Sequence, residues 1–434
     1  MKDLCEYGEL LKDHKISYGV YNNHLQNIKT DFQPKWTIFL SAKTLDTPAL
    51  LKLILLKIKY EKISFKIIKN QILQYQLNGG MLGENEIGKV ISLYPKSITD
   101  AIQLAKDLNA ISNTFKGPTI PNALRIGEIV YAESATISPI AYQISKQYLN
   151  PKKHPVRIGK YYVPIETIKT SYKGDIYKAV TLKGFSFKTC IIKQGKSAAL
   201  DDQYQREMKH RLLWQKTVIL DLQHDVMTPA YIDYFEDREH SYLVMEYAAG
   251  ITLFQTVTEI YQEKQWETIS TAQRKTLLLW YLDAVNIVDT IHQKGYVQRD
   301  ISDSNFLILT DGQLCIIDFE LSYSMTRNEP EHPFLLGTYG YVAPEQLRYA
   351  TPDYTEDIYS LGALLCFMLT GLSPVKFIET TPQHTRNKIH GITRSSALTK
   401  MIMDCLSLHR NRRPEIQTIK ETLTQYISEL ESKE

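Results

Sequence analysis

One stretch in the last third of the chain, residues 296–345, constrains the fold and the chemistry more than any other. Within it, Asp300 is followed five positions later by Asn305, and then by Asp318. Phosphoryl transfer from a nucleotide requires a carboxylate that orients the attacking hydroxyl, together with an amide and a second carboxylate that hold magnesium on the phosphates. The spacing therefore predicts ATP and Mg2+ as cofactors, with Asp300 as catalytic residue and Asn305 and Asp318 as metal ligands.

The bulk composition suits a soluble protein of several domains. A chain of 434 residues predicts two or three domains, and a net charge of +3 gives no reason to expect nucleic acid or a membrane surface as a partner. The five cysteines are scattered without a C-x-x-C pair, which indicates a reducing compartment. The first residues lack a signal-peptide pattern, and the most apolar early run, Ala49–Ile58, is too short to span a bilayer. We therefore predict a cytoplasmic protein.

The first third of the chain predicts an α+β domain. Short apolar runs bounded by glycine and polar residues are typical of strands, whereas a helix shows apolar residues on one face and a capping residue at its start. The predicted helices begin at Thr47-Pro48 and at Ser97. The predicted strands are residues 36–41, 63–68, 71–77, 90–94 and 129–131.

Four short motifs of this third stand in an order known from one enzyme family. They are Trp36 to Ala42, Phe65-Lys66, Gly88 to Pro95 and Gly117-Pro118. This order resembles the lyase domain of class III and class IV lanthipeptide synthetases, which removes phosphate from phosphoserine or phosphothreonine in a peptide. That step needs a base, cations that hold the phosphate and an acid that protonates it. The resemblance implies Lys66 as the base, with Lys89 and Arg125 as remaining cations.

The departures from this family pattern predict an impaired lyase. Thr37 stands where the family has a phosphate-binding lysine, and Phe39 stands where it has the histidine acid. An R-Y-G motif is also missing, because Tyr131-Ala132-Glu133 occupies that region. Phenylalanine cannot donate a proton, and loss of one such group typically costs orders of magnitude in rate. We predict a vestigial site that serves as scaffold or peptide-docking domain; alternatively, Lys66 and Lys89 merely line strand edges.

A segment with two prolines and several charges predicts a linker at residues 149–158. Before it, residues 1–148 form the predicted lyase-like domain. After it, residues 159–434 are predicted to form a bilobal protein kinase-like fold. The small lobe of that fold is assigned to residues 159–248 and the large lobe to residues 249–434.

The predicted small lobe carries weaker motifs in the order found in protein kinases. Two strands flank Gly174, the one glycine that remains of a loop that covers nucleotide phosphates in kinases, and Lys193 ends a β-branched strand as a phosphate-pairing lysine should. A helix over residues 200–214 is expected to carry Glu207 as the ion-pair partner of Lys193. Asp201 and Asp202 compete for this role, and a solvated carboxylate is the alternative interpretation.

A strand over residues 241–247 resembles a kinase hinge. By that resemblance Met245 is the gatekeeper, and Glu246 to Ala248 offer backbone groups to adenine. Leu307, which lies on the large-lobe side, is assigned to the same nucleotide site.

The large lobe resembles eukaryotic-like Ser/Thr kinases throughout. Gln298 replaces the usual histidine before Arg299-Asp300, where we expect packing and hydrogen bonding to matter more than chemistry. Arg299 retains the arginine that often pairs with a phosphate or acid of the activation segment. Glu320 replaces the glycine after Asp318-Phe319, so this loop should switch less readily. Glu345 is expected to form a buried structural ion pair with Arg413. Ser322, Ser324 and Thr326 are candidates for activating phosphorylation by position alone.

Two function hypotheses follow. The first is an ATP-dependent Ser/Thr kinase of the lanthipeptide-synthetase type that phosphorylates a ribosomally made precursor peptide. Full synthetases continue into a zinc-dependent cyclase, so elimination and cyclisation are expected to belong to partners such as a separate lyase or cyclase, or a second synthetase subunit. The alternative is a eukaryotic-like Ser/Thr signalling kinase or pseudokinase scaffold whose N-terminal domain binds phosphopeptides.

Overall fold

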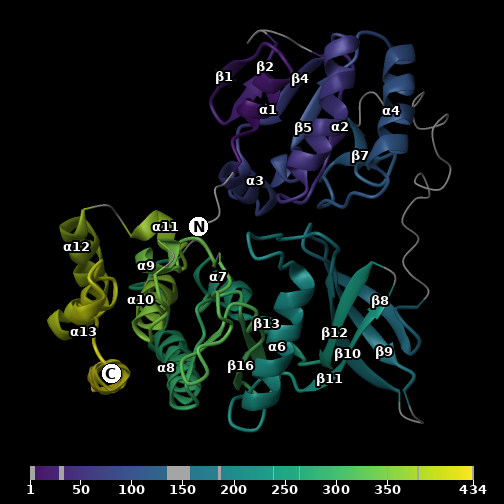
Figure 1. Cartoon of the computed structure of the whole chain (residues 1–434). Coiled ribbons are helices and arrows are strands. Elements are labelled where there is room, and N and C mark those ends of the chain that lie inside the picture. The colour runs from purple at the N-terminus through teal and green to yellow at the C-terminus, as the bar shows by residue number, and fades with distance from the viewer. Residues whose placement is uncertain are drawn as a thin grey trace. The chain divides into compact units, whose positions relative to one another are not determined.

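A computed structural model describes most of the chain, and its elements are labelled in Figure 1. The chain divides into two compact units. The first unit comprises Met1–Leu212 and Tyr234–Val244, and the second comprises Leu213–Asp233 and Met245–Glu434. The first unit thus combines the predicted lyase-like domain with most of the predicted small lobe, while the predicted linker lies mainly outside the described residues. The described residues are 5–28, 34–133, 157–183, 187–237, 239–262, 264–335, 337–348, 350–378 and 381–432.

The N-terminal part of the first unit is built on a seven-stranded sheet. Its strand order is β1-β2-β4-β5-β3-β7-β6, and every neighbouring pair is antiparallel. The strands are β1 (Gly19–Tyr21), β2 (His24–Gln26), β3 (Ile38–Leu40), β4 (Ser64–Ile68), β5 (Ile91–Tyr94), β6 (Ala123–Arg125) and β7 (Val130–Glu133). Four of the five predicted strands are therefore confirmed.

Helices cover one face of this sheet, and the core lies between them. Figure 1 shows α2 and α4 beside the strands. Because side chains alternate along a strand, Ile38 and Leu40 point into this core while Phe39, between them, faces the opposite side. The helices are α1 (Tyr7–Asp13), α2 (Thr47–Tyr60), α3 (Gln71–Asn78) and α4 (Ile98–Ser112), with a 3-10 turn, η1, at Glu84–Glu86.

The predicted strand over residues 71–77 is wrong, because this segment is helix α3. The Asn70 side chain caps it by accepting a hydrogen bond from the Leu73 N–H at 3.0 Å. Its buried face is polar, with Gln74 and Asn78 at 0 % exposure. The periodicity of apolar residues could not reveal this helix, because two of its buried positions hold polar side chains. Their amide groups donate hydrogen bonds to the Ala42 carbonyl.

A five-stranded sheet with order β11-β12-β10-β9-β8 forms the small-lobe part. Its strands are β8 (Tyr162–Lys169), β9 (Ile176–Thr181), β10 (Lys188–Gly195), β11 (Tyr231–Asp237) and β12 (His240–Glu246). Helix α6 runs from Met208 to Leu222, not over the predicted residues 200–214. The loop between β10 and α6 is therefore longer than expected.

The second unit is mainly helical. Residues 356–369 of α10 are buried except Tyr359, so this helix is enclosed on all sides. Among the described residues, none of the helices combines the length and apolar character needed to cross a bilayer. The helices are α7 (Leu253–Tyr261), α8 (Thr271–Gln293), α9 (Pro344–Leu347), α10 (Thr355–Thr370), α11 (Pro374–Phe377), α12 (Pro382–Thr393), α13 (Ser396–Cys405) and α14 (Ile416–Glu431), with a 3-10 turn, η3, at Arg410–Arg412. Its short strands are β13 (Gly250–Thr252), β14 (Tyr296–Val297), β15 (Phe306–Leu309), β16 (Leu314–Ile316) and β17 (Tyr323–Ser324).

Candidate active site

Asp300 lies in the loop between β14 and β15, and hydrogen bonds fix its carboxylate from both sides. The backbone N–H and the Oγ1 hydroxyl of Thr338 both donate to Oδ1, at 2.9 and 2.8 Å. The Asn305 Nδ2 donates to Oδ2 at 2.9 Å and to the Asp300 carbonyl at 2.8 Å. Residues far apart in sequence thus hold one carboxylate in a single orientation, as a group that orients a substrate hydroxyl requires.

The loop itself is anchored to helix α10. Asp357 is fully buried, and its two carboxylate oxygens accept the backbone N–H groups of Gln298 and Arg299, each at 2.8 Å. Arg299 has a φ of +67°, an unfavourable conformation for a residue with a Cβ. The buried carboxylate compensates for this strain and places Asp300 at the next position.

Gln298 packs in the interior and hydrogen-bonds, as the usual histidine at this position is expected to do; the expected loss of stiffness stays a prediction. Its side chain is fully buried. Its Oε1 accepts the Asp300 N–H, and its Nε2 donates to the Asp318 carbonyl at 2.7 Å. One amide therefore ties the catalytic loop to the segment that carries the second predicted metal ligand.

The groups around Asp300 fit a magnesium ion. The Asn305 Nδ2 makes both bonds to Asp300, which leaves the amide oxygen as the atom that would ligate a cation. Asp318 supplies a carboxylate held by the Glu320 N–H at 3.1 Å to Oδ1, next to the fully buried Phe319. Amide and carboxylate oxygens are the ligands that Mg2+ prefers, with water and phosphate oxygens completing its shell.

Electrostatics raise the proton affinity of Asp300. Burial is the main cause that raises the pKa of its carboxyl, followed by the negative charge of Asp318, while the hydrogen bonds from Thr338 act in the opposite direction. A carboxylate with a raised pKa accepts or orients a hydroxyl proton more effectively near neutral pH.

Arg299 makes a different ion pair from the one expected. Its Nε donates to Glu356 of α10 at 2.9 Å, and both side chains are at most 1 % exposed. Its Nη1 donates to the Phe334 carbonyl at 2.9 Å, so it contacts the activation segment through backbone rather than through a phosphate or acid. Of the three candidate phosphorylation sites, Ser322 and Ser324 are fully buried, and Thr326 alone is exposed.

The predicted ion pair between Glu345 and Arg413 is confirmed. Both guanidinium Nη atoms of Arg413 donate to the Glu345 carboxylate, with the Nη2–Oε2 bond at 2.9 Å. Arg413 is 7 % exposed and also donates to the Ser407 and Thr355 carbonyls. Such a bidentate pair fixes the end of the activation segment to the C-terminal part of the unit.

Comparison with known proteins agrees with this geometry. The protein kinase domain family matches residues 173–426, which is more than half of the chain. The chain belongs to the protein kinase family. The prediction that it is a protein kinase enzyme is thereby confirmed.

The relatives of this kinase are serine/threonine kinases, matched over part of their length. Serine/threonine-protein kinase B of Synechocystis sp. is 28% identical over 54% of this chain and 41% of its own. Serine/threonine-protein kinase D of the same organism is 26% identical over 59% of this chain and 50% of its own. The citron rho-interacting kinase of Rattus norvegicus is 31% identical over 41% of this chain and 9% of its own length. The chain thus spans no more than half the length of these relatives.

A second family matches the N-terminal part of the kinase. The family described as the RamC N-terminal domain covers residues 25–133. This is the region whose motifs resemble the lyase domain of lanthipeptide synthetases. The similarity is to that domain as a family and covers about a quarter of the chain.

The predicted nucleotide-binding residues are divided between the two units. Gly174 and Lys193 belong to the first unit, with Lys193 on β10 opposite Ile176. A Cβ at Gly174 would lie 1.7 Å from the Gln194 carbonyl oxygen, so glycine is required here for backbone packing whatever else it does. The remaining predicted residues belong to the second unit: Met245 and Glu246 end β12, Ala248 follows, and Leu307 lies on β15.

The prediction that Glu207 lies on a helix is wrong, and its pairing with Lys193 stays a prediction. Helix α6 begins at Met208, so Glu207 lies in the loop before it. Its Oε2 accepts the Ala198 N–H at 2.6 Å and pairs with the Lys43 Nζ at 3.2 Å. The physical reason is local, because this loop needs an acceptor for a backbone N–H that neither β10 nor α6 satisfies.

Helix α6 also buries two polar side chains that sequence reasoning missed. Arg211 is 4 % exposed and Gln215, one helical turn later, is fully buried. The sequence did indicate this burial, because Arg211 and Gln215 lie at helical spacing from the apolar face formed by Leu212, Val218 and Leu222. These two residues are therefore buried more deeply than Glu207, whose side chain is 13 % exposed.

The N-terminal sheet brings the predicted lyase residues into one row. Strand register aligns Lys66 with Ser92, Ser92 with Phe39, Phe39 with Tyr131 and Tyr131 with Arg125. Residues paired in this way across antiparallel strands project from the same face. The row lies on the face opposite the helices, and Phe39 occupies its centre.

The surroundings of this row match the departures seen in the sequence. The Lys89 Nζ lies 5.3 Å from the centre of the Phe39 ring and 3.1 Å from Glu86. Arg125 donates to carbonyls of its own β6–β7 turn. Thr37 is 3 % exposed and carries no charge. An aromatic ring and a neutral hydroxyl thus occupy the two positions where the sequence departs from the pattern that the resemblance implies.

Proposed function

We propose that this kinase transfers the γ-phosphate of ATP, with Mg2+, to a serine or threonine hydroxyl. The observation that carries the proposal is the carboxylate of Asp300, held on one oxygen by Thr338 and on the other by Asn305. In this arrangement Asp300 orients the substrate hydroxyl and takes up its proton. Asn305 and Asp318 would hold Mg2+, and Lys193 would pair with the nucleotide phosphates. The bound magnesium would neutralise charge that develops on the phosphate oxygens.

The proposed substrate is a ribosomally made precursor peptide of the lanthipeptide type. The match of residues 25–133 to the RamC N-terminal domain supports this, together with the row of Lys66, Phe39 and Arg125 on one sheet face. Phe39 cannot protonate a leaving phosphate, so elimination on this domain should be impaired. The phosphopeptide would then pass to a partner, either a separate lyase or cyclase or a second synthetase subunit.

The test is incubation of the whole chain with magnesium, ATP and a candidate precursor peptide, followed by mass spectrometry. Phosphorylated peptide should accumulate without loss of phosphate. Asp300→Asn should abolish the product, whereas Asp311→Asn, which changes an exposed aspartate in a turn of the same unit, should not.

Each contrary outcome identifies the part that fails. Dehydrated peptide formed by this protein alone would overturn the prediction that the lyase site is impaired. Absence of phosphate from every peptide and from the protein itself would overturn the kinase proposal. Phosphate on cellular proteins but on no precursor would favour the signalling alternative.

A further inference from the structure

The loop that joins β10 to α6, residues 196–207, has a strained backbone. Ala198, Leu200 and Gln205 have φ values of +58°, +55° and +62°. This left-handed region is unfavourable for residues with a Cβ, and such residues persist where surrounding contacts over-determine them. This loop directly follows β10, the strand that carries Lys193. Contacts that hold the loop therefore also influence the predicted phosphate-binding end of β10.

The contacts that hold this loop come from the N-terminal domain. The Thr44 N–H donates to Asp201 Oδ2 at 2.6 Å, and the Asn78 Nδ2 donates to Asp201 Oδ1 at 2.9 Å. The Lys43 Nζ pairs with Glu207, the residue that also accepts the Ala198 N–H. Asn78 is fully buried and donates to a carbonyl of its own domain as well, so its donor is oriented in advance.

The same domain reaches the loop between β8 and β9. The Tyr172 hydroxyl donates to the Gly79 carbonyl at 3.1 Å. A Cβ on Gly80 would lie 3.3 Å from that hydroxyl, so the approach is close. Tyr172 lies two residues before Gly174, and the Lys196 Nζ links this turn to the β10–α6 loop through Asp175 at 2.8 Å. One surface of the N-terminal domain therefore contacts both loops that flank the predicted nucleotide phosphates.

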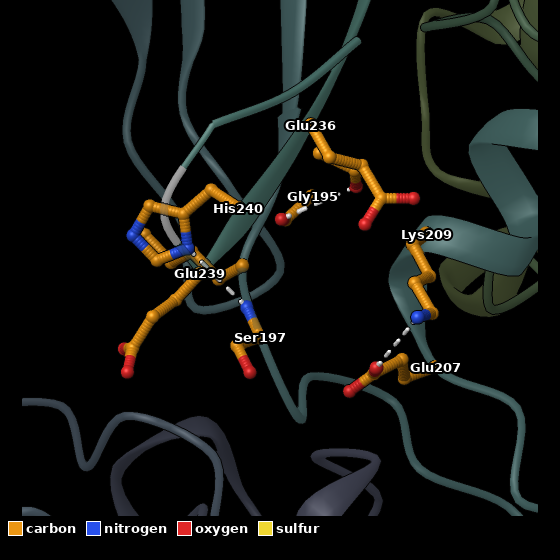
Figure 2. Close-up of a pocket in the computed structure, with 9 residues that line it drawn as sticks. Gly195, Ser197, Glu207, Lys209, Glu236, Glu239 and His240 are labelled. Carbon is orange, nitrogen blue, oxygen red and sulfur yellow. Dashed lines mark hydrogen bonds and ion pairs between the residues drawn. The ribbon is translucent and has the colours of Figure 1, made fainter.

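A pocket lined mainly by polar and charged side chains adjoins the β10–α6 loop. Its volume is about 190 Å3, and Figure 2 shows charged side chains around it. Contacts join several of its lining residues: the Ser197 N–H donates to His240 Nδ1 at 3.4 Å, the Ser241 Oγ donates to the Gly195 carbonyl at 3.4 Å, and the Lys209 Nζ lies 3.9 Å from Glu207 Oε1. The loop is also held by its buried apolar residues Ala198, Ala199 and Leu200, and the polar contacts from the N-terminal domain add to that packing.

We propose that Lys43, Thr44 and Asn78 of the N-terminal domain are positioning residues for phosphoryl transfer. They hold the β10–α6 loop, and through it the strand of Lys193, in the arrangement that phosphate binding needs. This inference rests on the proposed kinase function. It also gives the N-terminal domain a task that does not depend on lyase chemistry.

The test is a charge reversal across the Lys43–Glu207 pair. Lys43→Glu places two carboxylates together and should lower kcat about tenfold with little change in KM for the peptide. The double variant Lys43→Glu with Glu207→Lys restores opposite charges and should exceed the single variant Glu207→Lys, which lacks the acceptor for the Ala198 N–H to the same extent. Lys400→Glu, which disrupts an exposed Lys–Asp pair on α13, is the matched control and should leave kcat unchanged.

Two further measurements keep the proposal falsifiable. Amide hydrogen exchange of residues 188–207 should be faster in Lys43→Glu than in Lys400→Glu, a result that does not depend on activity. Tyr172→Phe removes a single hydroxyl and serves if the charge variants unfold; it should lower kcat several-fold. Unchanged exchange, unchanged or increased kcat of Lys43→Glu in an active folded enzyme, or a double variant no better than Glu207→Lys would overturn the positioning role. If the unaltered protein itself showed no kinase activity, this result would instead overturn the proposed function.

Discussion

Replacing Thr338 with valine removes the hydroxyl that donates to Asp300 Oδ1 at 2.8 Å and keeps the volume and the backbone N–H that donates at 2.9 Å. The lost bond is made to an ionised carboxylate, for which a net contribution of about 1.5–3 kcal/mol is typical. Thr338 is partly exposed, so we take a value near the lower end, about 2 kcal/mol. The bond stabilises the ionised form of Asp300, so the energy appears as a change in the pKa of that carboxyl.

The pH dependence of kcat measures this change. At 1.36 kcal/mol per unit, the acid limb of the profile should move upward by about 1.5 pH units in Thr338→Val. The free energy of unfolding should fall by about 2 kcal/mol at a pH where Asp300 is ionised, and the difference should disappear when it is protonated. Thr338→Ser retains the hydroxyl and should match the unaltered enzyme in both measurements. An acid limb that stays in place in the valine variant would refute this account of Thr338.

Two other substitutions test buried polar groups. Gln298→Leu leaves the Asp300 N–H and the Asp318 carbonyl without their bonds, so urea unfolding should show a loss of about 2–4 kcal/mol, against almost none for the exposed Gln417→Leu. At Asp201, burial raises the pKa to about 6, so the folded protein binds a proton there more tightly than the unfolded chain. The stability that this group contributes is complete below its ordinary pKa and is lost as the pH rises through about 6. The measurement is the unfolding free energy of the unaltered protein minus that of Asp201→Asn. This difference should fall between pH 4 and 6 and stay level at higher pH. A difference that rises between pH 4 and 6 would contradict the argument.

The catalytic loop was predictable because its chemistry is local. Asp300 and Asn305 lie five residues apart, and the structure joins them by a direct side-chain hydrogen bond. Their roles as orienting group and metal ligand remain proposals. The pair of Glu345 and Arg413 was also expected from the sequence, and the structure confirms it. Thr338 was not singled out as a partner of Asp300, because nothing in the sequence relates residues 38 positions apart until the activation segment folds back.

The N-terminal domain shows where pattern reading fails. The strand expected over residues 71–77 is a helix because Gln74 and Asn78 fill its buried face and hydrogen-bond to the Ala42 carbonyl. Apolar periodicity assumes that buried positions are apolar, and here they are not. The helical position predicted for Glu207 is wrong for a different reason: the helix begins at Met208, so this carboxylate lies in the preceding loop and accepts the Ala198 N–H.

The sequence by itself predicted a protein kinase, which the family match confirms, because short motifs have a spacing that reflects the chemistry of phosphoryl transfer. It also proposed the residues of the site, whose roles stay predictions. Apart from the pair of Glu345 and Arg413, only the tertiary structure decided which of these polar groups meet. It pairs Arg299 with Glu356, aligns Phe39 with Lys66 through Ser92, and sets Lys43 against Glu207. Such contacts join segments brought together by strand register and domain packing, and the energy of each depends on burial, which no local pattern specifies.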